Sequence, residues 1–204
     1  MDRRQHWEQV YQNKTPESVS WFQPDPVLSR QLIEATGVGT NDAIIDVGGG
    51  ASRLVDCLLE AGYRDVSVLD IAPSALAHAQ QRLGEAAEAV TWIEADITRF
   101  VPPKRYALWH DRAAFHFLTD AQDRERYREA LFEGLAPEGH LIIAAFALDG
   151  PIRCSGLDIV RYDSKGLQSI LGPTFRLRDS VQEIHCTPSG GEQKFGYHWF
   201  QRIS

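Results

Sequence analysis

Short apolar runs alternate with segments of helical pattern along the middle of the chain, and this alternation limits the fold more than any other feature. The apolar runs have the length and the β-branched or aromatic content that are typical of strands. They occupy residues 43–47, 65–70, 90–95, 106–111 and 140–146. Helical patterns with capping, proline or glycine signals lie between them, over 52–62, 73–83 and 120–136. Such alternation predicts a mostly parallel sheet with helices on both faces.

The C-terminal part of the chain departs from this alternation. After a helical segment over 164–171, two extended runs, 175–186 and 192–203, are joined by TPSGG at 187–191. A turn of this composition between two extended runs predicts a β-hairpin. We therefore predict an α/β fold, a three-layer sandwich whose mostly parallel, seven-stranded sheet ends in an antiparallel hairpin over 174–203.

The N-terminal residues 1–36 are expected to form a helical lid, because their helical pattern is interrupted by the aromatic-rich stretch KTPESVSWFQPDP. Trp21 in this stretch is a candidate for the cofactor or substrate pocket, since aromatic side chains exclude water and contact apolar or cationic ligands. Trp7 and Tyr11 are expected to pack on the sheet. No linker is visible, so the 204 residues are expected to form a single domain.

A glycine-rich turn, DVGGGAS, follows the first predicted strand. Glycines let a ligand approach the backbone, and the helix that follows points its N–H groups at that ligand. A dinucleotide-binding turn would need a small residue where Arg53 stands. The spacing is instead an acid, Asp46, followed by small residues at Gly48, Gly50 and Ser52. Because an acid in the turn repels a pyrophosphate and attracts an ammonium group, the turn favours a ligand with a cationic head and no phosphate.

Two further acids follow predicted strands on the same edge of the sheet. Asp70 ends the second strand, 20 residues after Gly50, where a carboxylate accepts hydrogen bonds from both hydroxyls of a ribose. Asp96 follows the third strand and is placed to accept from an exocyclic amino group such as that of adenine. Ile71 and Ile97 would supply apolar contacts to the faces of the base.

This constellation resembles the Rossmann-like (class I) S-adenosylmethionine-dependent methyltransferases over roughly residues 43–146. HWEQVY followed by SWFQ also resembles the N-terminal lid of thiopurine-type and thiol-type small-molecule methyltransferases. Ser52 departs from the glycine most common in the family, but it is small. The resemblance implies S-adenosyl-L-methionine as cofactor and in-line transfer of its methyl group to an N, O or S nucleophile of a small molecule. The residues expected at the cofactor are Trp21, Asp46, Gly48, Gly49, Gly50, Ser52, Asp70, Ile71, Asp96, Ile97, His110 and Asp111.

The substrate side is expected at the tip of the fourth strand and at the hairpin turn. Asp111 could orient the substrate or the amino-acid end of the cofactor, with a capping aspartate as the alternative. His116 is a candidate general base because the ordinary pKa of histidine lies near working pH. His185 beside the hairpin turn is a second candidate. For both histidines the alternative is a packed structural ring.

Additional substrate-side candidates carry positive charge or a hydroxyl. Arg112 follows Asp111, and Arg161 and Tyr162 lie in the irregular segment after the fifth strand, where they could bind an anionic group. For Arg161, an ion pair within the protein is equally open. Cys154 is not expected to be a nucleophile, because methyl transfer from a sulfonium requires none.

Charge and composition limit the classes of partner and the cellular location that we expect. The net charge is −7 and the fourth strand ends in WHDR rather than an N-P-P-Y type motif, both of which disfavour nucleic acid. The longest apolar run, 141–148, is too short to span a bilayer, and the first residues form no signal peptide. Three widely spaced cysteines suit a reducing compartment, so a cytoplasmic location is expected.

Other functional interpretations remain open at this point. An aromatic pattern shared with a branch of lysine methyltransferases makes a protein substrate the main alternative. A protein that binds S-adenosylmethionine without chemistry is an alternative of another class. Neither H-x-x-x-H nor C-x-x-C occurs, so no metal is expected. The protein is expected to act as a monomer or homodimer on a small molecule.

Overall fold

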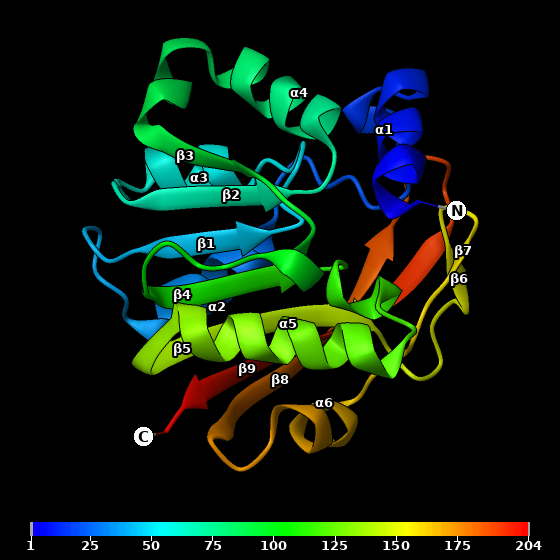
Figure 1. Ribbon diagram of the computed structural model, residues 1–204. Coiled ribbons are helices and arrows are strands. Elements are labelled where there is room, and N and C mark those ends of the chain that lie inside the picture. Colours follow the sequence, from blue (N-terminus) through cyan, green and yellow to red (C-terminus); the bar gives the residue numbers. More distant parts are fainter. Residues whose placement is uncertain (1, 204) are drawn as a thin grey trace.

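The computed structural model describes residues 2–203 and is built around a seven-stranded sheet (Figure 1). The strands follow the order β3-β2-β1-β4-β5-β9-β8 across the sheet. Their bounds are β1 (Ile44–Val47), β2 (Val66–Asp70), β3 (Val90–Glu94), β4 (Tyr106–Arg112), β5 (Leu135–Phe146), β8 (Phe175–Cys186) and β9 (Glu192–Arg202). The first five strands pair in parallel, and β9 pairs antiparallel with both β5 and β8. The predicted fold class is therefore confirmed.

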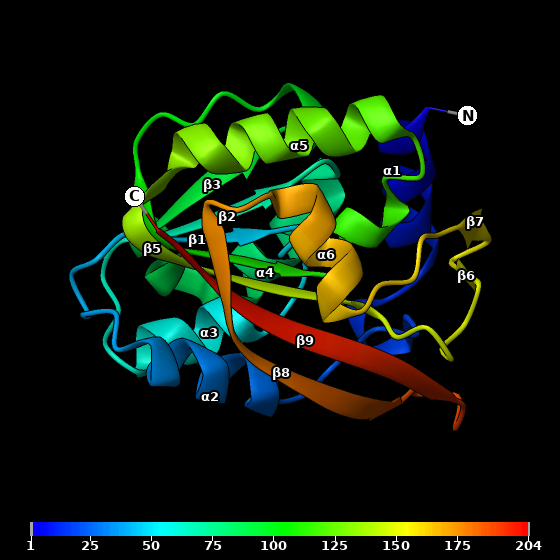
Figure 2. The ribbon, with the colours of Figure 1, turned by 90° about the horizontal axis from the view of Figure 1, so that it is seen from below.

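Helices cover both faces of the sheet, as Figure 2 shows with α5 on one side and α2 and α3 on the other. The helices are α1 (Arg3–Asn13), α2 (Val27–Thr36), α3 (Leu54–Glu60), α4 (Pro73–Leu83), α5 (Ala121–Gly134) and α6 (Ser164–Leu171). Short 3-10 turns lie at Pro16–Ser18, Gly84–Ala89, Ile97–Arg99 and Phe115–Phe117. Alternate residues of β1 face opposite layers: Ile44 packs with α2 and α3, and Ile45 packs with α5 and α6.

Local sequence signals explain where the helices begin and end. Pro73 occupies the first turn of α4, and Gly84 follows the helix with a positive φ of 57°. Asp120 caps α5 by accepting a hydrogen bond from the Gln122 amide at 2.7 Å, and Asp163 caps α6 through the Gly166 amide, also at 2.7 Å.

Two features of the second half differ from the sequence prediction. Strand β5 begins at Leu135 rather than at residue 140, because Leu135 already pairs with Tyr106 before an irregularity in the register. A small hairpin of β6 (Arg153–Cys154) and β7 (Leu157–Asp158) forms in the segment after β5. Ser155 and Gly156, both with positive φ, make its turn, and two-residue strands are too short to leave a period-2 pattern.

The N-terminal helix α1 lies beside α4, over the edge where β1 to β4 end (Figure 1). The Glu8 carboxylate accepts hydrogen bonds from the amide and hydroxyl of Ser74 at the start of α4, at 3.2 and 2.9 Å. Strand β8 runs parallel to β1, so the turn over 187–191 reaches this same edge. The single-domain organisation stays a prediction. Within residues 2–203 no helix combines the length and the apolar character needed to cross a membrane.

Candidate cofactor and substrate site

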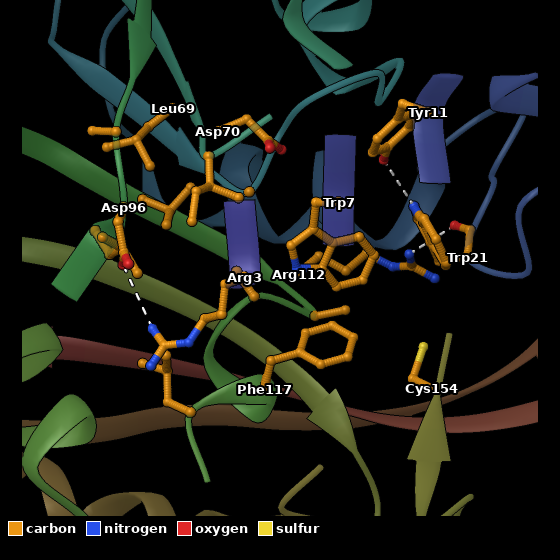
Figure 3. Close-up of a pocket in the computed structure, with 18 of the residues that line it drawn as sticks. Arg3, Trp7, Tyr11, Trp21, Leu69, Asp70, Asp96, Arg112, Phe117 and Cys154 are labelled. Atoms are coloured by element: carbon orange, nitrogen blue, oxygen red, sulfur yellow. Dashed lines mark hydrogen bonds and ion pairs between the residues drawn. The ribbon is translucent and has the colours of Figure 1, made fainter. Parts of the chain in front are cut away.

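A cavity of about 830 Å³, its open mouth included, lies at the carboxyl ends of the parallel strands (Figure 3). Open parallel sheets bind ligands at this edge. One end of the cavity is formed by residues that follow β1, β2 and β3. The other end is formed by the N-terminal segment, the residues after β4, and side chains of β6 and β9. An adjoining cavity of about 550 Å³ runs along the glycine-rich turn and shares Gly48, Tyr11, Trp21 and Arg112 with the first.

The glycine-rich turn approaches its neighbours so closely that side chains would not fit. Gly48 has a φ of +69°, and a Cβ there would lie 2.7 Å from the Cβ of Ala114. A Cβ on Gly49 would lie 2.5 Å from Asp46 Oδ2, and one on Gly50 would lie 2.5 Å from Asp70 Oδ2. Gly48 and Gly49 line the cavities, as does Ser52, and Gly50 lies against Asp70. The turn therefore keeps two carboxylates beside an open backbone, which fits a ligand that carries an ammonium and hydroxyl groups.

The first acid of the constellation, Asp46, is 3% exposed and lines the adjoining cavity. Its Oδ1 lies 2.7 Å from Nδ1 of His110 on β4. Nε2 of the same ring lies 2.9 Å from the hydroxyl of Ser29 on α2. Asp46 and His110 were both predicted to lie at the cofactor, and their side chains are in contact in the structure. Ser29 carries no local signal and could be found only from the packing of α2 on the sheet.

Asp70 lines the main cavity at the end of β2 and is 7% exposed. Its Oδ1 accepts a hydrogen bond from the Ala72 amide at 2.8 Å. Burial raises the pKa of this carboxyl to about 7, and the neighbouring charge of Asp46 adds to the rise, while the Ala72 N–H opposes it. The Asp70 carboxyl is therefore partly protonated near neutral pH. A ligand that donates hydrogen bonds from hydroxyl groups would stabilise its ionised form.

This raised pKa predicts a pH-dependent affinity for S-adenosylhomocysteine, the demethylated form of the cofactor that the sequence resemblance implies. An ionised Asp70 can accept from one hydroxyl group at each oxygen, whereas protonation turns one of these oxygens into a donor, so binding should release a proton. Affinity should then rise with pH, by roughly tenfold from pH 6 to pH 8, as the competent ionised fraction grows. Calorimetry across this range measures the slope. Asp70→Asn, which has no proton to lose, should bind weakly with no such slope; an equal slope in the variant would contradict the assignment.

Asp96 follows β3 and also lines the main cavity. Its Oδ1 accepts hydrogen bonds from the amide and hydroxyl of Thr98 at 2.9 and 2.8 Å, and Arg3 Nη1 lies 3.6 Å from that oxygen. Arg3 also contacts Asp123 on α5. Ile71 and Ile97 line the same end of the cavity, as expected for contacts to a flat base. The contact between α1 and Asp96 was not predicted, because a lone arginine at a helix start gives no signal.

Aromatic side chains surround the far end of the cavity (Figure 3). Trp7 packs edge-on against Trp21 and Phe117, with ring centroids 5.6 and 4.9 Å apart, and Trp21 Nε1 donates to the Tyr11 hydroxyl at 3.3 Å. Trp21 lines both cavities, and its contact with a cofactor or substrate stays a prediction. Trp7 and Tyr11 were expected to pack on the sheet, but both line the cavity. Their spacing of four residues on α1 puts them on one face of the helix, which is the available signal.

Arg112 at the end of β4 is held from several sides and lines both cavities. Its Nε donates to the Tyr197 hydroxyl at 2.8 Å, and its Nη1 donates to the Trp21 carbonyl at 3.0 Å. The guanidinium carbon lies 4.5 Å from the centre of the Phe195 ring, and Glu183 Oε2 lies 3.7 Å from Nη2. These contacts tie the N-terminal segment to β4 and β9 and place a fixed positive charge beside the cavity.

Several residues predicted for the substrate side lie outside the lining of both cavities. They are Asp111, His116, His185, Arg161 and Tyr162. Asp111 is fully buried, and its carboxylate accepts hydrogen bonds from the amides of Ala114 and Phe115 and from the Tyr127 hydroxyl, at 3.0, 3.2 and 2.8 Å. Burial raises the pKa of this carboxyl to about 6. Its geometry is that of the capping aspartate that the sequence left open as the alternative, holding the turn after β4.

The two histidines predicted as bases are packed rings in the structure. His116 is fully buried against Phe146, and burial lowers its pKa to about 3, which makes it a weak base near neutral pH. His185 is 6% exposed and donates from Nε2 to the Ser20 carbonyl at 2.8 Å, so it anchors the N-terminal segment instead of facing the cavity. The positions of His116 and His185 in the sequence do not indicate whether their rings face the cavity or the protein interior.

The segment after β5 contributes Cys154 to the lining of the cavity. Arg161 and Tyr162, which were predicted to bind an anionic group, do not line it. Arg161 Nη1 donates to the Gly150 carbonyl at 3.2 Å, and the Tyr162 ring packs against Phe115 at 5.3 Å. Cys154 is buried, and burial raises the pKa of its thiol to about 11, so the thiol stays protonated and uncharged. Within residues 2–203 the fold gathers no group of three His, Cys, Asp or Glu side chains able to hold a metal.

Comparisons with known proteins agree with this geometry. Residues 44–139 match the family described as a methyltransferase domain. Comparison with curated protein sequences gives no match. Among solved structures, a methyltransferase from Anabaena variabilis has a TM-score of 0.77 at 15% identity, covering 99% of this chain and 96% of the other.

Two further solved structures show the same fold. One, described with the conversion of a disulfide bond into a thioacetal group during echinomycin biosynthesis, has a TM-score of 0.79 at 14% identity and coverage of 99% and 92%. The Burkholderia thailandensis 1,6-didemethyltoxoflavin N1-methyltransferase, solved with its substrate and S-adenosylhomocysteine, has a TM-score of 0.70 at 20% identity and coverage of 98% and 84%. The match covers residues 44–139, which include the glycine-rich turn and the acids after β2 and β3, and the protein is an S-adenosylmethionine-dependent methyltransferase.

Proposed function

We propose that the protein methylates a small molecule whose apolar body occupies the aromatic end of the cavity. The observation that carries this proposal is the continuity of the site. The carboxylates of Asp70 and Asp96 line the main cavity together with aromatic rings from α1, from the 3-10 turn Phe115–Phe117 and from β9, and α1 covers it. The third carboxylate, Asp46, lines the adjoining cavity, which shares Gly48 with the main one. The lining of the main cavity is mostly apolar with a few polar groups, as is typical of small-molecule sites.

The cofactor site is assigned to the residues at the ends of β1, β2 and β3. Asp70 would accept from the ribose hydroxyls, Asp96 would accept from the adenine amino group, and Ile71 and Ile97 would contact the base. Asp46 would accept from the ammonium of the amino-acid end. When bound, S-adenosylmethionine supplies an electrophilic methyl group. The chain supplies alignment and the exclusion of water, and such alignment is worth about 7–11 kcal/mol when the near-attack geometry is held well.

The acceptor end is assigned to the aromatic rings and to Arg112. Trp7, Trp21, Phe117 and Phe195 would enclose the acceptor and place its nucleophilic atom in line with the transferred methyl group. For a neutral acceptor, the proton lost on methylation leaves to water or buffer. One solved neighbour is described as the N1-methyltransferase of 1,6-didemethyltoxoflavin, and another is described with the conversion of a disulfide bond into a thioacetal group. These descriptions support a small-molecule acceptor.

A labelled-methyl screen tests the proposal. The protein is incubated with S-adenosyl-L-[methyl-³H]methionine and, separately, with aromatic thiols, heteroaromatic amines, small acids, and cell lysate divided into low-mass and protein fractions. We expect label in low-mass products and turnover with at least one acceptor of apolar body. Label confined to a protein band would favour the lysine-methyltransferase alternative instead. Tight cofactor binding with no turnover on any fraction would favour a binding protein without chemistry.

A further inference from the structure

His110 and Ser29 form a buried pair behind the first acid of the glycine-rich turn. The His110 ring is 2% exposed and Ser29 is 1% exposed, so neither side chain is free to reach a substrate. The ring is nevertheless held at both nitrogens, by Asp46 Oδ1 at 2.7 Å and by the Ser29 hydroxyl at 2.9 Å. Both residues, with Asp46, form part of the wall of the adjoining cavity.

The direction of these hydrogen bonds follows from the chemistry of the groups. A carboxylate only accepts hydrogen bonds, so the ring proton that faces Asp46 is on Nδ1. In the neutral ring Nε2 is then an acceptor, and the Ser29 hydroxyl donates to it. Ser29 on α2 thereby fixes the tautomer and tilt of His110 on β4, and His110 fixes the carboxylate of Asp46 on β1.

The two oxygens of Asp46 have different surroundings. Oδ1 is held by His110. Oδ2 faces the turn, where a Cβ on Gly49 would lie only 2.5 Å from it. The absence of a side chain at Gly49 leaves room beside Oδ2, and Gly49 and Asp46 line the same cavity. With Oδ1 held, rotation of the carboxylate is restricted and Oδ2 keeps facing the space along the turn.

We propose that His110, supported by Ser29, is a positioning residue that holds Asp46 so that its free oxygen receives the ammonium group of the cofactor's amino-acid end. The inference rests on the proposed role of Asp46 and adds the residues that make this role possible. His110 acts through Asp46 and does not touch the cofactor. Preorganisation of an acceptor by a second hydrogen bond is a general way to strengthen a charged contact.

The test compares two ligands that differ only at the amino-acid end. S-adenosylhomocysteine carries the ammonium, and 5′-methylthioadenosine has the same nucleoside but no amino-acid end. His110→Leu keeps the ring's approximate volume and removes the donor to Asp46. We expect calorimetry to show affinity for S-adenosylhomocysteine about tenfold weaker, with affinity for 5′-methylthioadenosine changed less than twofold. A general structural defect would weaken both ligands alike.

Two further variants sharpen this comparison. His110→Asn retains an amide N–H near the place of Nδ1 and should restore affinity for S-adenosylhomocysteine to within about threefold of the unmodified protein. His198→Leu is the matched control. His198 is also a buried histidine, 4% exposed, and its Nδ1 lies 2.9 Å from the hydroxyl of Ser180. Its side chain lines neither cavity. It should leave both affinities unchanged.

A double-mutant cycle with Asp46→Asn shows whether the effect passes through Asp46. If it does, His110→Leu should cost less than twofold in the Asp46→Asn background. Equal weakening of both ligands, or a tenfold loss that persists in that background, overturns the inference while leaving the assignment of the cofactor site intact. If the unmodified protein bound 5′-methylthioadenosine but not S-adenosylhomocysteine, the assigned role of Asp46 would itself fail. Ser29→Ala, with an expected smaller loss confined to S-adenosylhomocysteine, is the substitute should His110→Leu not fold.

Discussion

Replacing Asp70 by alanine should weaken S-adenosylhomocysteine binding at least 100-fold, the largest effect that we expect from any single substitution. The side chain is 7% exposed and lines the cavity, where no bulk water replaces a lost acceptor. A carboxylate that accepts from two ribose hydroxyls makes two charge-assisted hydrogen bonds, each worth about 1.5–3 kcal/mol. Loss of both corresponds to at least 100-fold in affinity, since every 1.4 kcal/mol is tenfold.

Isothermal titration calorimetry measures this loss, and Asp65→Ala is its control. Asp65 directly precedes the same strand at the opposite edge of the sheet, where its carboxylate pairs with Lys104. The Asp65→Ala variant should bind the ligand with unchanged affinity, because this partly exposed ion pair lies at the other end of β2 from the cavity and contributes little to stability. If Asp70→Ala bound within threefold of the unmodified protein, the ribose assignment would be abandoned. The thermal midpoint of each variant, measured without ligand, separates loss of binding from loss of folding.

The fold could be predicted almost completely from the sequence, because strand–helix alternation leaves few topologies. Five of the predicted strands and the hairpin exist with shifts of a few residues, and α4 and α6 occupy 73–83 and 164–171 as predicted. Such signals are local: a β-branched run, a proline at a first turn, a glycine after a helix. The exception is β5, whose first residues include Pro137 and Gly139 and pair only because Tyr106 offers a partner strand.

The meeting of the residues proposed for the cofactor could also be predicted, because these residues are fixed to strand ends. In a parallel sheet the tips of β1, β2 and β3 must meet, so Asp46, Asp70 and Asp96 come together whatever the loops do. Asp70 and Asp96 line the main cavity, and Asp46 lines the adjoining one. For these residues, the position at the end of a strand determines which edge of the sheet the side chain lies at.

The residues at the proposed acceptor end could not be predicted as well, because their place depends on which face of the sheet each side chain points to. Neighbours on β4 alternate between faces, so Arg112 lines the cavity while Asp111 turns into the opposite layer, toward Tyr127. A one-residue difference thus exchanges a site residue for a capping residue. Phe195 reaches the cavity from β9, some 80 residues beyond β4, and no short-range pattern indicates that approach.

Replacing Trp7 by alanine should lower kcat/KM for the acceptor about 50-fold. Trp7 lies inside the cavity and packs edge-on against Trp21 and Phe117 at 5.6 and 4.9 Å, so its removal opens the cover that α1 forms. A 50-fold loss corresponds to about 2.3 kcal/mol, which is reasonable for one half-buried indole and two aromatic contacts. Trp199→Ala is the matched control, because Trp199 lies outside both cavities and packs edge-on against His140, with ring centroids 5.5 Å apart. Trp7→Phe, which keeps a ring between the same neighbours, should recover most of the activity. Steady-state kinetics with an acceptor found in the labelled-methyl screen measures all three variants; an equal loss in Trp7→Ala and Trp199→Ala would mean that Trp7 supports the fold and does not cover the site.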